Sequence, residues 1–452
     1  MSKVVEKNSA EANATYGTLT EEGLQRLRQR VGLQFNQPRV PHNLEVTFDG
    51  VRHFALGYGD DNPLWCDRHY GDGTRWKGLI APPNFIYTMG KQDAPSPSPE
   101  QKALLKGDPL AGLGSYQAVM EFEWWRPQRL GDELLARCAL VGVQLRTNSR
   151  FSGRTVAEIL AFIYRNQNDE LVGIRRGTWL RAERSASAER KKAYELPQPY
   201  SAEQITEIDA CSMAEKVRGA DALYWEDVEV GDQLPTIVRG PLRVSDVIVW
   251  HIGWGMQLTP PGNFRISHKI RQKAPGLYTP NALNIPDTVQ RLHWEKEWAA
   301  ELGIPTPYDY GGLRETFLTN ICTNWMGDDG WLWKLSCEHR KFVYLGDTNW
   351  IKGRVKEKRQ QDGRNEVYLE VWVENQWGTV VTPGEAVVLL PTRQAPVDLP
   401  RPAEEQLDAM IAHEVARYAR PDGLESNIEP DDVRVVSTAD PRLKPCASGE
   451  PD

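Results

Sequence analysis

The chain has 452 residues, a formal net charge of −8 and six cysteines. This length exceeds that of one ordinary core and predicts about two domains joined by linkers. The acidic balance argues against a general affinity for nucleic acid or for an anionic membrane surface, so the expected partner is a small molecule or another protein.

The sequence lacks the segments that mark membrane, metal-binding and nucleotide-binding proteins. No apolar run approaches the roughly 18 to 20 residues of a membrane span, and residues 1–10 have no apolar signal core, so we expect a cytoplasmic protein. The cysteines form no Cys-x-x-Cys pair and have no His at zinc-ligand spacing, which predicts reduced thiols. The glycine-rich segments match neither Rossmann nor P-loop spacing, so we predict no cofactor.

The first part of the chain predicts an extension followed by an α+β domain. Residues 1–39 form the extension, which is polar and disordered over residues 1–16 and then helical from a cap at Thr20. Residues 40–185 form the first domain, with a short helix that ends at Gly57 and a loop over 92–115 that is long enough to be a lid. A second helical segment covers 84–89, and the predicted strands are 118–125, 133–143, 154–165 and 171–180.

The second part repeats this plan after a linker. The linker covers residues 186–222 and contains a capping-box helix start at Ser201, and the second domain covers 223–395. Leu-Gly-Asp and Asn-Gln segments recur about 210 residues apart, which indicates duplication. The second domain is predicted to contain a helix from Ser245, an inserted block over 258–286, a long helix from Gly312 to about Met326 and late strands; residues 396–452 add a helix over about 403–419 and a disordered tail.

The most informative stretch lies between Asp287 and Gly312. Asp287 supplies a carboxylate and His293 an imidazole, and Gly311 and Gly312 then open a helix. These are the groups needed to move a proton and to stabilise an oxyanion. A degraded copy occurs earlier, as Gly59–Trp65 followed by Gly78–Pro83, so one half has the groups for chemistry and the other does not.

On these motifs, residues 40–392 resemble a tandem hotdog protein of the MaoC-like acyl dehydratase and (R)-specific enoyl-CoA hydratase superfamily. The resemblance implies an α+β double hotdog, in which each half is an antiparallel sheet wrapped around a central helix. Catalytic members carry Gly-Asp-x-Asn-Pro-x-His and then an Ala-His-Gly-type turn. The first half keeps Asp60 but has Trp65 in place of the His and Pro82-Pro83 in place of His-Gly. Indole cannot accept a proton and proline has no N–H, so this half resembles a non-catalytic lobe that houses the acyl chain.

In the second half, residues 293–303 align with the family's catalytic histidine segment and residues 308–311 with its Ala-His-Gly turn. His293 is then implied to be the catalytic histidine. The family's acid falls at Thr288, and the nearest carboxylate is Asp287. The pair would hold one water, while the N–H groups around Gly311 and Gly312 bind the thioester oxygen. The alternative is that His293 packs against the following helix and Asp287 ends the inserted block.

Several other side chains have two interpretations. Asp309 is a second acid or a structural cap, Arg314 meets a phosphate or pairs with a carboxylate, and Trp294 lines an acyl pocket or packs in the core. Asp246 and His251 have the family's five-residue spacing but should diverge on a helix, where Ser245 or Asp246 serves as a cap. A cluster that binds coenzyme A phosphates, or is a solvated strand face, comprises His339, Arg340, Lys341, Lys352, Arg354 and Lys356.

The resemblance implies a hydro-lyase that interconverts 3-hydroxyacyl and trans-2-enoyl thioesters of coenzyme A. The 16 tryptophans permit a bulky or aromatic acyl group. A homodimer is the expected assembly. Two alternatives are a non-catalytic acyl-CoA-binding or scaffold subunit of a dehydratase complex and a hotdog thioesterase.

Overall fold

The structure is a computed structural model that describes residues 17–36, 41–149, 153–183, 195–255, 264–404 and 406–419. The predicted disorder of residues 1–16 and of the C-terminal tail lies outside these ranges, as do parts of the linker and of the inserted block. None of the helices in these ranges has the length and apolarity needed to cross a membrane.

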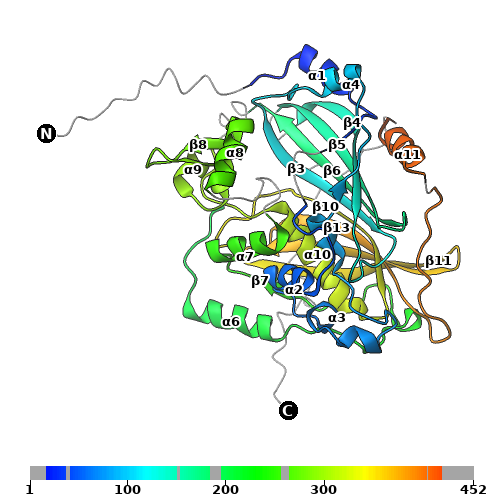
Figure 1. The fold of residues 1–452 in the computed structure, drawn as a ribbon. Coiled ribbons are helices and arrows are strands. Elements are labelled where there is room, and N and C mark those ends of the chain that lie inside the picture. The colour runs from blue at the N-terminus through cyan, green and yellow to red at the C-terminus, as the bar shows by residue number, and fades with distance from the viewer. Residues whose placement is uncertain are drawn as a thin grey trace.

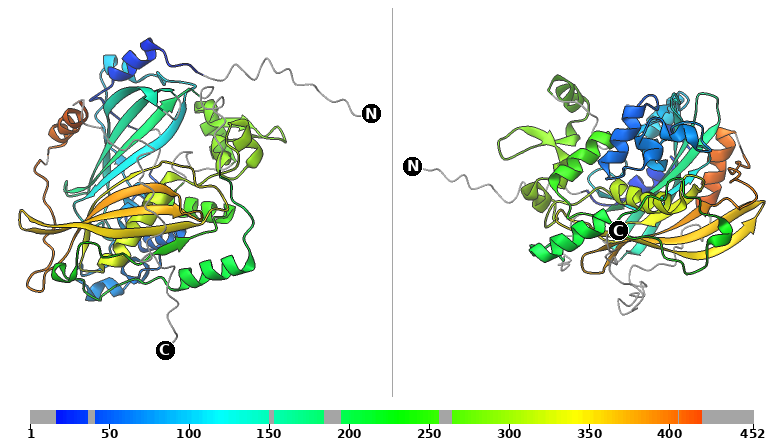
Figure 2. Two further views of the ribbon diagram at one scale, coloured as in Figure 1. Left: turned by 180° about the vertical axis from the view of Figure 1, so that it is seen from behind. Right: turned by 90° about the horizontal axis from the view of Figure 1, so that it is seen from below.

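One continuous sheet runs through the described part of the molecule, in the order β1-β4-β5-β6-β3-β10-β13-β12-β11-β7 (Figure 1). The two halves join where β3 pairs antiparallel with β10, as at Phe122 and Leu335. Figure 2 shows the long first-half strands β3 to β6 in cyan to teal beside the second-half strands β10 to β13 in yellow to orange. The first-half strands are β1 Gln34–Phe35, β2 Lys91–Gln92, β3 Gly114–Trp124, β4 Leu135–Ser149, β5 Gly153–Arg165 and β6 Leu171–Ala182; the second-half strands are β7 Ile237–Arg239, β10 Trp331–Glu338, β11 Asn349–Gln361, β12 Arg364–Asn375 and β13 Val380–Leu389.

The long helix α10, Gly311–Met326, is confirmed and lies against β10, β11, β12 and β13. The first half has no helix of that length at the matching place in the described structure. It has the short 3₁₀ helix η3, Pro83–Thr88, which follows Pro82 and ends before Gly90. A Cβ on Gly90, whose φ is +102°, would come within 2.7 Å of Ala136. The close approach of the chain to β4 therefore ends the segment that was predicted over residues 84–89.

The remaining helices confirm two predicted caps and change three boundaries. Thr20 caps α1, and Ser201 and Gln204 form a reciprocal capping box on α6. Arg243, rather than Ser245, is the N-cap residue of α7, and Asp246, the other predicted cap, accepts its backbone N–H; the predicted loop contains α4; and α11 begins at Leu407, later than predicted. The bounds are α1 Glu21–Arg28, α2 Phe48–Gly57, α3 Pro63–Cys66, η2 Tyr70–Gly73, α4 Pro99–Leu105, α6 Ala202–Met213, η4 Trp225–Asp227, α7 Val244–Trp254, α8 Arg265–Lys273, η5 Pro275–Leu277, η6 Val289–His293, α9 Lys296–Glu301 and α11 Leu407–Ala419; α8 is followed by the hairpin of β8 Tyr278–Pro280 and β9 Pro286–Thr288.

Matching turns in the two halves support the duplication. Asp132 accepts the backbone N–H of Arg129 and the side-chain amide of Gln167. At the corresponding place Asp347 accepts the backbone N–H of Tyr344 and the side-chain amide of Gln376. The repeated Leu-Gly-Asp and Asn-Gln segments therefore brace each other in the same way in both halves.

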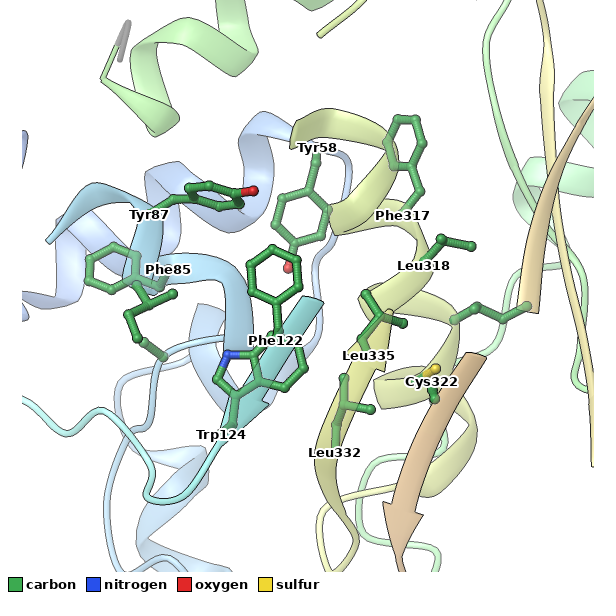
Figure 3. Close-up of a cluster of buried hydrophobic side chains, with 14 of the residues drawn as sticks. Tyr58, Phe85, Tyr87, Phe122, Trp124, Phe317, Leu318, Cys322, Leu332 and Leu335 are labelled. Carbon is green, nitrogen blue, oxygen red and sulfur yellow. The ribbon is translucent and has the colours of Figure 1, made fainter. Parts of the chain in front are cut away.

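The two halves share one hydrophobic core, which Figure 3 shows in close-up. Phe122 and Trp124 of β3 stack at 5.2 Å between ring centroids. The second half lies beside these two rings, with Phe317 and Leu318 of α10 and Leu335 of β10 (Figure 3). Burial of such large rings favours a single folding unit over two independent lobes.

Helices α2 and α7 cross at two glycines. A Cβ on Gly253 would lie 2.7 Å from the carbonyl oxygen of His53 and 2.9 Å from the Cα of Phe54. Gly57 of α2 similarly faces the backbone of α7 at Val249. Backbone atoms cannot yield as a flexible side chain can, so the crossing requires glycine.

We expect Gly253→Ala to lower the free energy of unfolding by about 1 to 3 kcal/mol, because the added methyl forces the two helices apart. Denaturant unfolding followed by circular dichroism measures this. Gly276→Ala is the matched control, since a Cβ there meets nothing within 4 Å. Equal stabilities for the two variants would contradict the close crossing.

Candidate active site at the start of α10

The segment that leads into α10 is fixed by backbone hydrogen bonds to the β10–β11 connection. The N–H of Asp309 donates to Val343 O at 2.9 Å, and that of Leu345 donates to Pro307 O at 3.0 Å. Tyr310 is the N-cap residue of α10 and supplies no side-chain capping bond. The first N–H groups of the helix, at Gly311 and Gly312, are therefore available to an anionic or carbonyl oxygen.

His293 closes η6 and lies against this helix start. Its Nδ1 is 2.8 Å from the carbonyl oxygen of Tyr308, and its ring stacks on Tyr310 at 3.7 Å. A carbonyl oxygen only accepts, so Nδ1 carries the hydrogen and Nε2 is the basic nitrogen of the neutral ring. Burial, with a smaller contribution from nearby His251, lowers the pKa of His293 to about 3.

His251 reaches the same place from α7, although the sequence left its orientation open. Its ring lies 4.5 Å from that of Tyr310, and its buried Nε2 has no hydrogen-bond partner among the described residues. Burial lowers the pKa of His251 to about 4. Asp246 instead pairs with Arg243, at 2.6 Å, so the two members of the five-residue motif diverge on the helix. Trp294 is half-buried and meets His251 edge-on at 5.9 Å, which places it at the candidate site.

The two buried neutral imidazoles predict loss of stability in acid. Both pKa values are lowered from 6.5, so unfolding takes up protons when the pH falls below about 6.5. For each histidine the free energy of unfolding then decreases by about 1.4 kcal/mol per pH unit, until the pH reaches its folded pKa of about 3 or 4. Urea unfolding of the wild type and His293→Gln at pH 5 to 8 measures this. We expect the variant to lose less stability between pH 6.5 and 5; parallel curves would contradict a buried neutral His293.

Asp287 is held in the β8–β9 hairpin. Its Oδ1 accepts the N–H of Thr288 at 2.7 Å, and its Oδ2 lies 3.4 Å from the side-chain nitrogen of Asn281. Thr288, at the family's acid position, caps η6 through the N–H of Gln290. Thus the structure gives Asp287 and His293 different hydrogen-bond partners, although they are six residues apart in the sequence.

Asp309 and Arg314 form a buried ion pair, with 2.9 Å between Oδ2 and Nε. Arg314 also donates to Lys341 O and to the hydroxyl of Thr382. Burial raises the pKa of Asp309 to about 7, against the opposing effect of Arg314. Arg314 therefore pairs with a carboxylate, which was one of its two interpretations. The pair lies inside the protein rather than at its surface, because the sheet encloses α10. The guanidinium of Arg314 is occupied by Asp309 and by acceptors in the core, which disfavours a contact with a substrate phosphate.

The first two glycines of α10 have different neighbours. A Cβ on Gly311 would lie 2.9 Å from His339 Nε2 and 3.2 Å from Gln117 Oε1. A Cβ on Gly312 would be in ordinary contact with Trp254, at 3.6 Å. Gly311 therefore allows a first-half side chain and a second-half imidazole to approach the helix start.

A buried polar network one turn into α10 was missed by the sequence analysis. Glu315 is fully buried and accepts from the hydroxyl of Tyr87, the side-chain amide of Gln117 and His339 Nε2, the last at 3.0 Å. His339 Nδ1 is buried without a partner in the described structure. Burial and Arg314 lower the pKa of His339, against the opposing effect of Glu315. The sequence signal was a glutamate on the buried helix α10, but two of its partners, Gln117 and Tyr87, come from β3 and η3 of the first half.

Four of the other basic residues of the predicted cluster pair with carboxylates on the sheet. Arg340, which follows the end of β10, bonds Glu338, the last residue of that strand, and Lys341 is exposed. The cross-strand pairs are Lys352 with Glu374, Arg354 with Glu370 and Lys356 with Glu385. This neutralised pattern favours the solvated strand face over a phosphate site.

The degraded motif of the first half keeps its carboxylate in a structural setting. Asp60 accepts from the hydroxyl of Tyr58, the N–H of Asn62 and the indole Nε1 of Trp65, the last at 3.0 Å. Burial raises the pKa of Asp60 to about 6. Trp65 donates at the place of the family's histidine and cannot take up a proton. Across the described ranges, no three His, Cys, Asp or Glu side chains are grouped to hold a metal ion.

Comparison with known proteins shows which family the chain is similar to. Residues 30–173 match the model of the FAS1-like, dehydratase domain region. A UPF0336 protein from Parafrankia sp. is 30% identical over 132 residues, which are 28% of this chain and 78% of the relative. A probable enoyl-CoA hydratase alpha subunit from Thermomonospora curvata is 25% identical over 189 residues, 40% of this chain and 58% of the relative. A solved MaoC-like dehydratase superposes with a TM-score of 0.54 and 17% identity, covering 80% of this chain and 99% of its own.

Proposed function

The chain belongs to the MaoC-like dehydratase superfamily, a family of hydratases and dehydratases with the double hotdog fold, and on that basis we propose that it is a hydro-lyase for acyl-CoA thioesters. It would interconvert a trans-2-enoyl thioester and its 3-hydroxyacyl product. The proposal depends chiefly on neutral His293, held through Nδ1 by the Tyr308 carbonyl beside the uncapped start of α10.

The geometry supports a simple route for the proton. A water gives a proton to the basic nitrogen of His293 while its oxygen bonds to C3. The electrons of the C2–C3 double bond move to C2 and to the thioester carbonyl, and the N–H groups of Gly311 and Gly312 stabilise the enolate oxygen. The imidazolium then returns the proton to C2, so that one water has been added. His251 Nε2 and Tyr310 Oη are buried and have no hydrogen-bond partner within the described ranges, so they offer further bonds to the water and to the substrate.

We assign the first half to binding rather than to chemistry. Its own motif pairs Asp60 with Trp65, and its aromatic side chains line the core shared with α10. Asp287, implied as the acid, has its oxygens bonded within the hairpin. We therefore place the proton transfer on His293 and give Asp287 the smaller role of fixing the hairpin beside η6.

Product analysis tests this function. The purified full chain is incubated with a panel of 2-enoyl-CoA thioesters, and hydroxyacyl-CoA and free thiol are quantified by mass spectrometry. Hydroxyacyl-CoA without free thiol is the expected result. Free thiol alone would indicate a thioesterase, and binding without either product would indicate a non-catalytic lobe; both would overturn the proposal.

A further inference from the structure

Two consecutive arginines on β6 project to opposite faces of the sheet. Arg176 lies on the outer side, where Nε and Nη2 bond the two oxygens of Glu414 at 2.6 and 2.7 Å and Nη1 bonds Glu123. Both arginines are 4% exposed. The pairing of Arg176 is the side-on, two-bond arrangement by which a guanidinium binds a carboxylate.

Arg175 lies on the inner side without such a partner. Its neighbours across the strands are Phe122 and Phe162, and its guanidinium lies 3.9 Å from the ring centroid of Phe162 and 4.8 Å from that of Tyr87. It hydrogen-bonds the side chain of Tyr164. Its Nε and Nη2 are buried and have no hydrogen-bond partner in the described structure. A buried guanidinium with two unused donors on one edge is costly unless an acceptor fills that edge.

The nearby buried carboxylate does not occupy this edge. The oxygens of Glu315 are bonded to Tyr87, Gln117 and His339. Tyr87 connects the two places, because its hydroxyl donates to Glu315 while its ring lies against Arg175. Tyr87 therefore lies between Arg175 and Glu315, which belongs to the helix α10 that begins at Gly311.

We propose that the Nε and Nη2 edge of Arg175 binds a carboxylate carried by the acyl group of the substrate, so that the preferred substrates are thioesters of dicarboxylic acids. This inference rests on the proposed function, which sets the thioester carbonyl at the start of α10 and sends the acyl chain toward the first-half core. Two adjacent parallel donors match the two oxygens of a carboxylate, whereas a keto or hydroxyl oxygen satisfies only one of them.

Substrate selectivity tests the inference. The ratio of kcat/KM for an ω-carboxy-2-enoyl-CoA to that for the alkyl 2-enoyl-CoA of equal chain length is measured over several lengths. We expect the wild type to favour the carboxylate at its best length by at least about tenfold, and Arg175→Met to lower that ratio by at least about tenfold. A wild type that prefers the alkyl thioester at every length, or a ratio unchanged in Arg175→Met, would overturn the inference.

Matched variants separate binding from structural effects. Arg175→Lys keeps the charge but loses the two-donor edge, and Arg176→Lys makes the same change on the outer face. We expect the first to lower the ratio and the second to leave it unchanged while weakening the contact with Glu414. If Arg175→Met does not fold, Arg175→Lys and the wild-type ratio still decide the matter.

Binding without turnover distinguishes this inference from the proposed reaction. Calorimetry with saturated ω-carboxyacyl-CoA and acyl-CoA needs no chemistry. Tighter binding of the carboxylate, lost by about tenfold or more in Arg175→Met, supports the carboxylate site even if no thioester is hydrated. Equal affinities for the two ligands, together with measurable hydration, would overturn the carboxylate site and leave the hydro-lyase intact.

Discussion

His293→Ala is expected to lower kcat by about 10² to 10⁴-fold with 2-enoyl-CoA substrates, because it removes the group that accepts the proton of water. The contacts of His293 with Tyr308 and Tyr310 fix one tautomer and orientation. Alanine would leave the start of α10 intact but without a base. Steady-state kinetics at pH 7 to 8, with circular dichroism to verify folding, measure the effect.

Asp287→Asn is the matched comparison for this prediction. It alters the carboxylate that the resemblance implies, but asparagine keeps an oxygen for the N–H of Thr288. We expect it to retain kcat within about tenfold, because that carboxylate is not bonded to His293 in the structure. An inactive Asp287→Asn beside an active His293→Ala would reverse the two roles.

Glu315→Ala is expected to lower the free energy of unfolding by about 3 to 5 kcal/mol. It would leave the hydroxyl of Tyr87, the amide of Gln117 and His339 Nε2 buried without their acceptor. Chemical denaturation followed by tryptophan fluorescence measures the loss.

Two controls bracket that result. Glu315→Gln keeps one acceptor oxygen and should lose less stability than the alanine variant. Glu385→Ala removes a carboxylate from an exposed pair with Lys356, which should cost about 1 kcal/mol or less. A loss in Glu315→Ala no larger than that in Glu385→Ala would contradict the buried network.

The strands and α10 could be predicted because their signals are local. Alternating burial along β12, and the apolar residues that enclose α10, follow from the residues of each element. The Glu315 network could not be predicted in this way. Tyr87 and Gln117 are separated from Glu315 by 228 and 198 residues, and they meet it because β3 pairs with β10 and the halves share one core.

The candidate site was predicted in part for a related reason. His293 stacks on Tyr310, the residue that precedes the two glycines at the start of α10. Within the described residues no hydrogen bond links Asp287 to His293, and the oxygens of Asp287 lie against Thr288 and Asn281 in the β8–β9 hairpin. His251, which lies 42 positions before His293, reaches the same place from α7. The spacing of residues in the sequence did not show which way its side chain points.

Loss of enoyl-thioester absorbance in the presence of the purified chain, compared between the wild type and His293→Ala, measures whether His293 carries the hydration. We expect hydration by the wild type with at least one 2-enoyl-CoA and about 10²-fold or greater loss in the variant. A wild type that hydrates none of them, or a folded His293→Ala protein that retains full turnover, would contradict it.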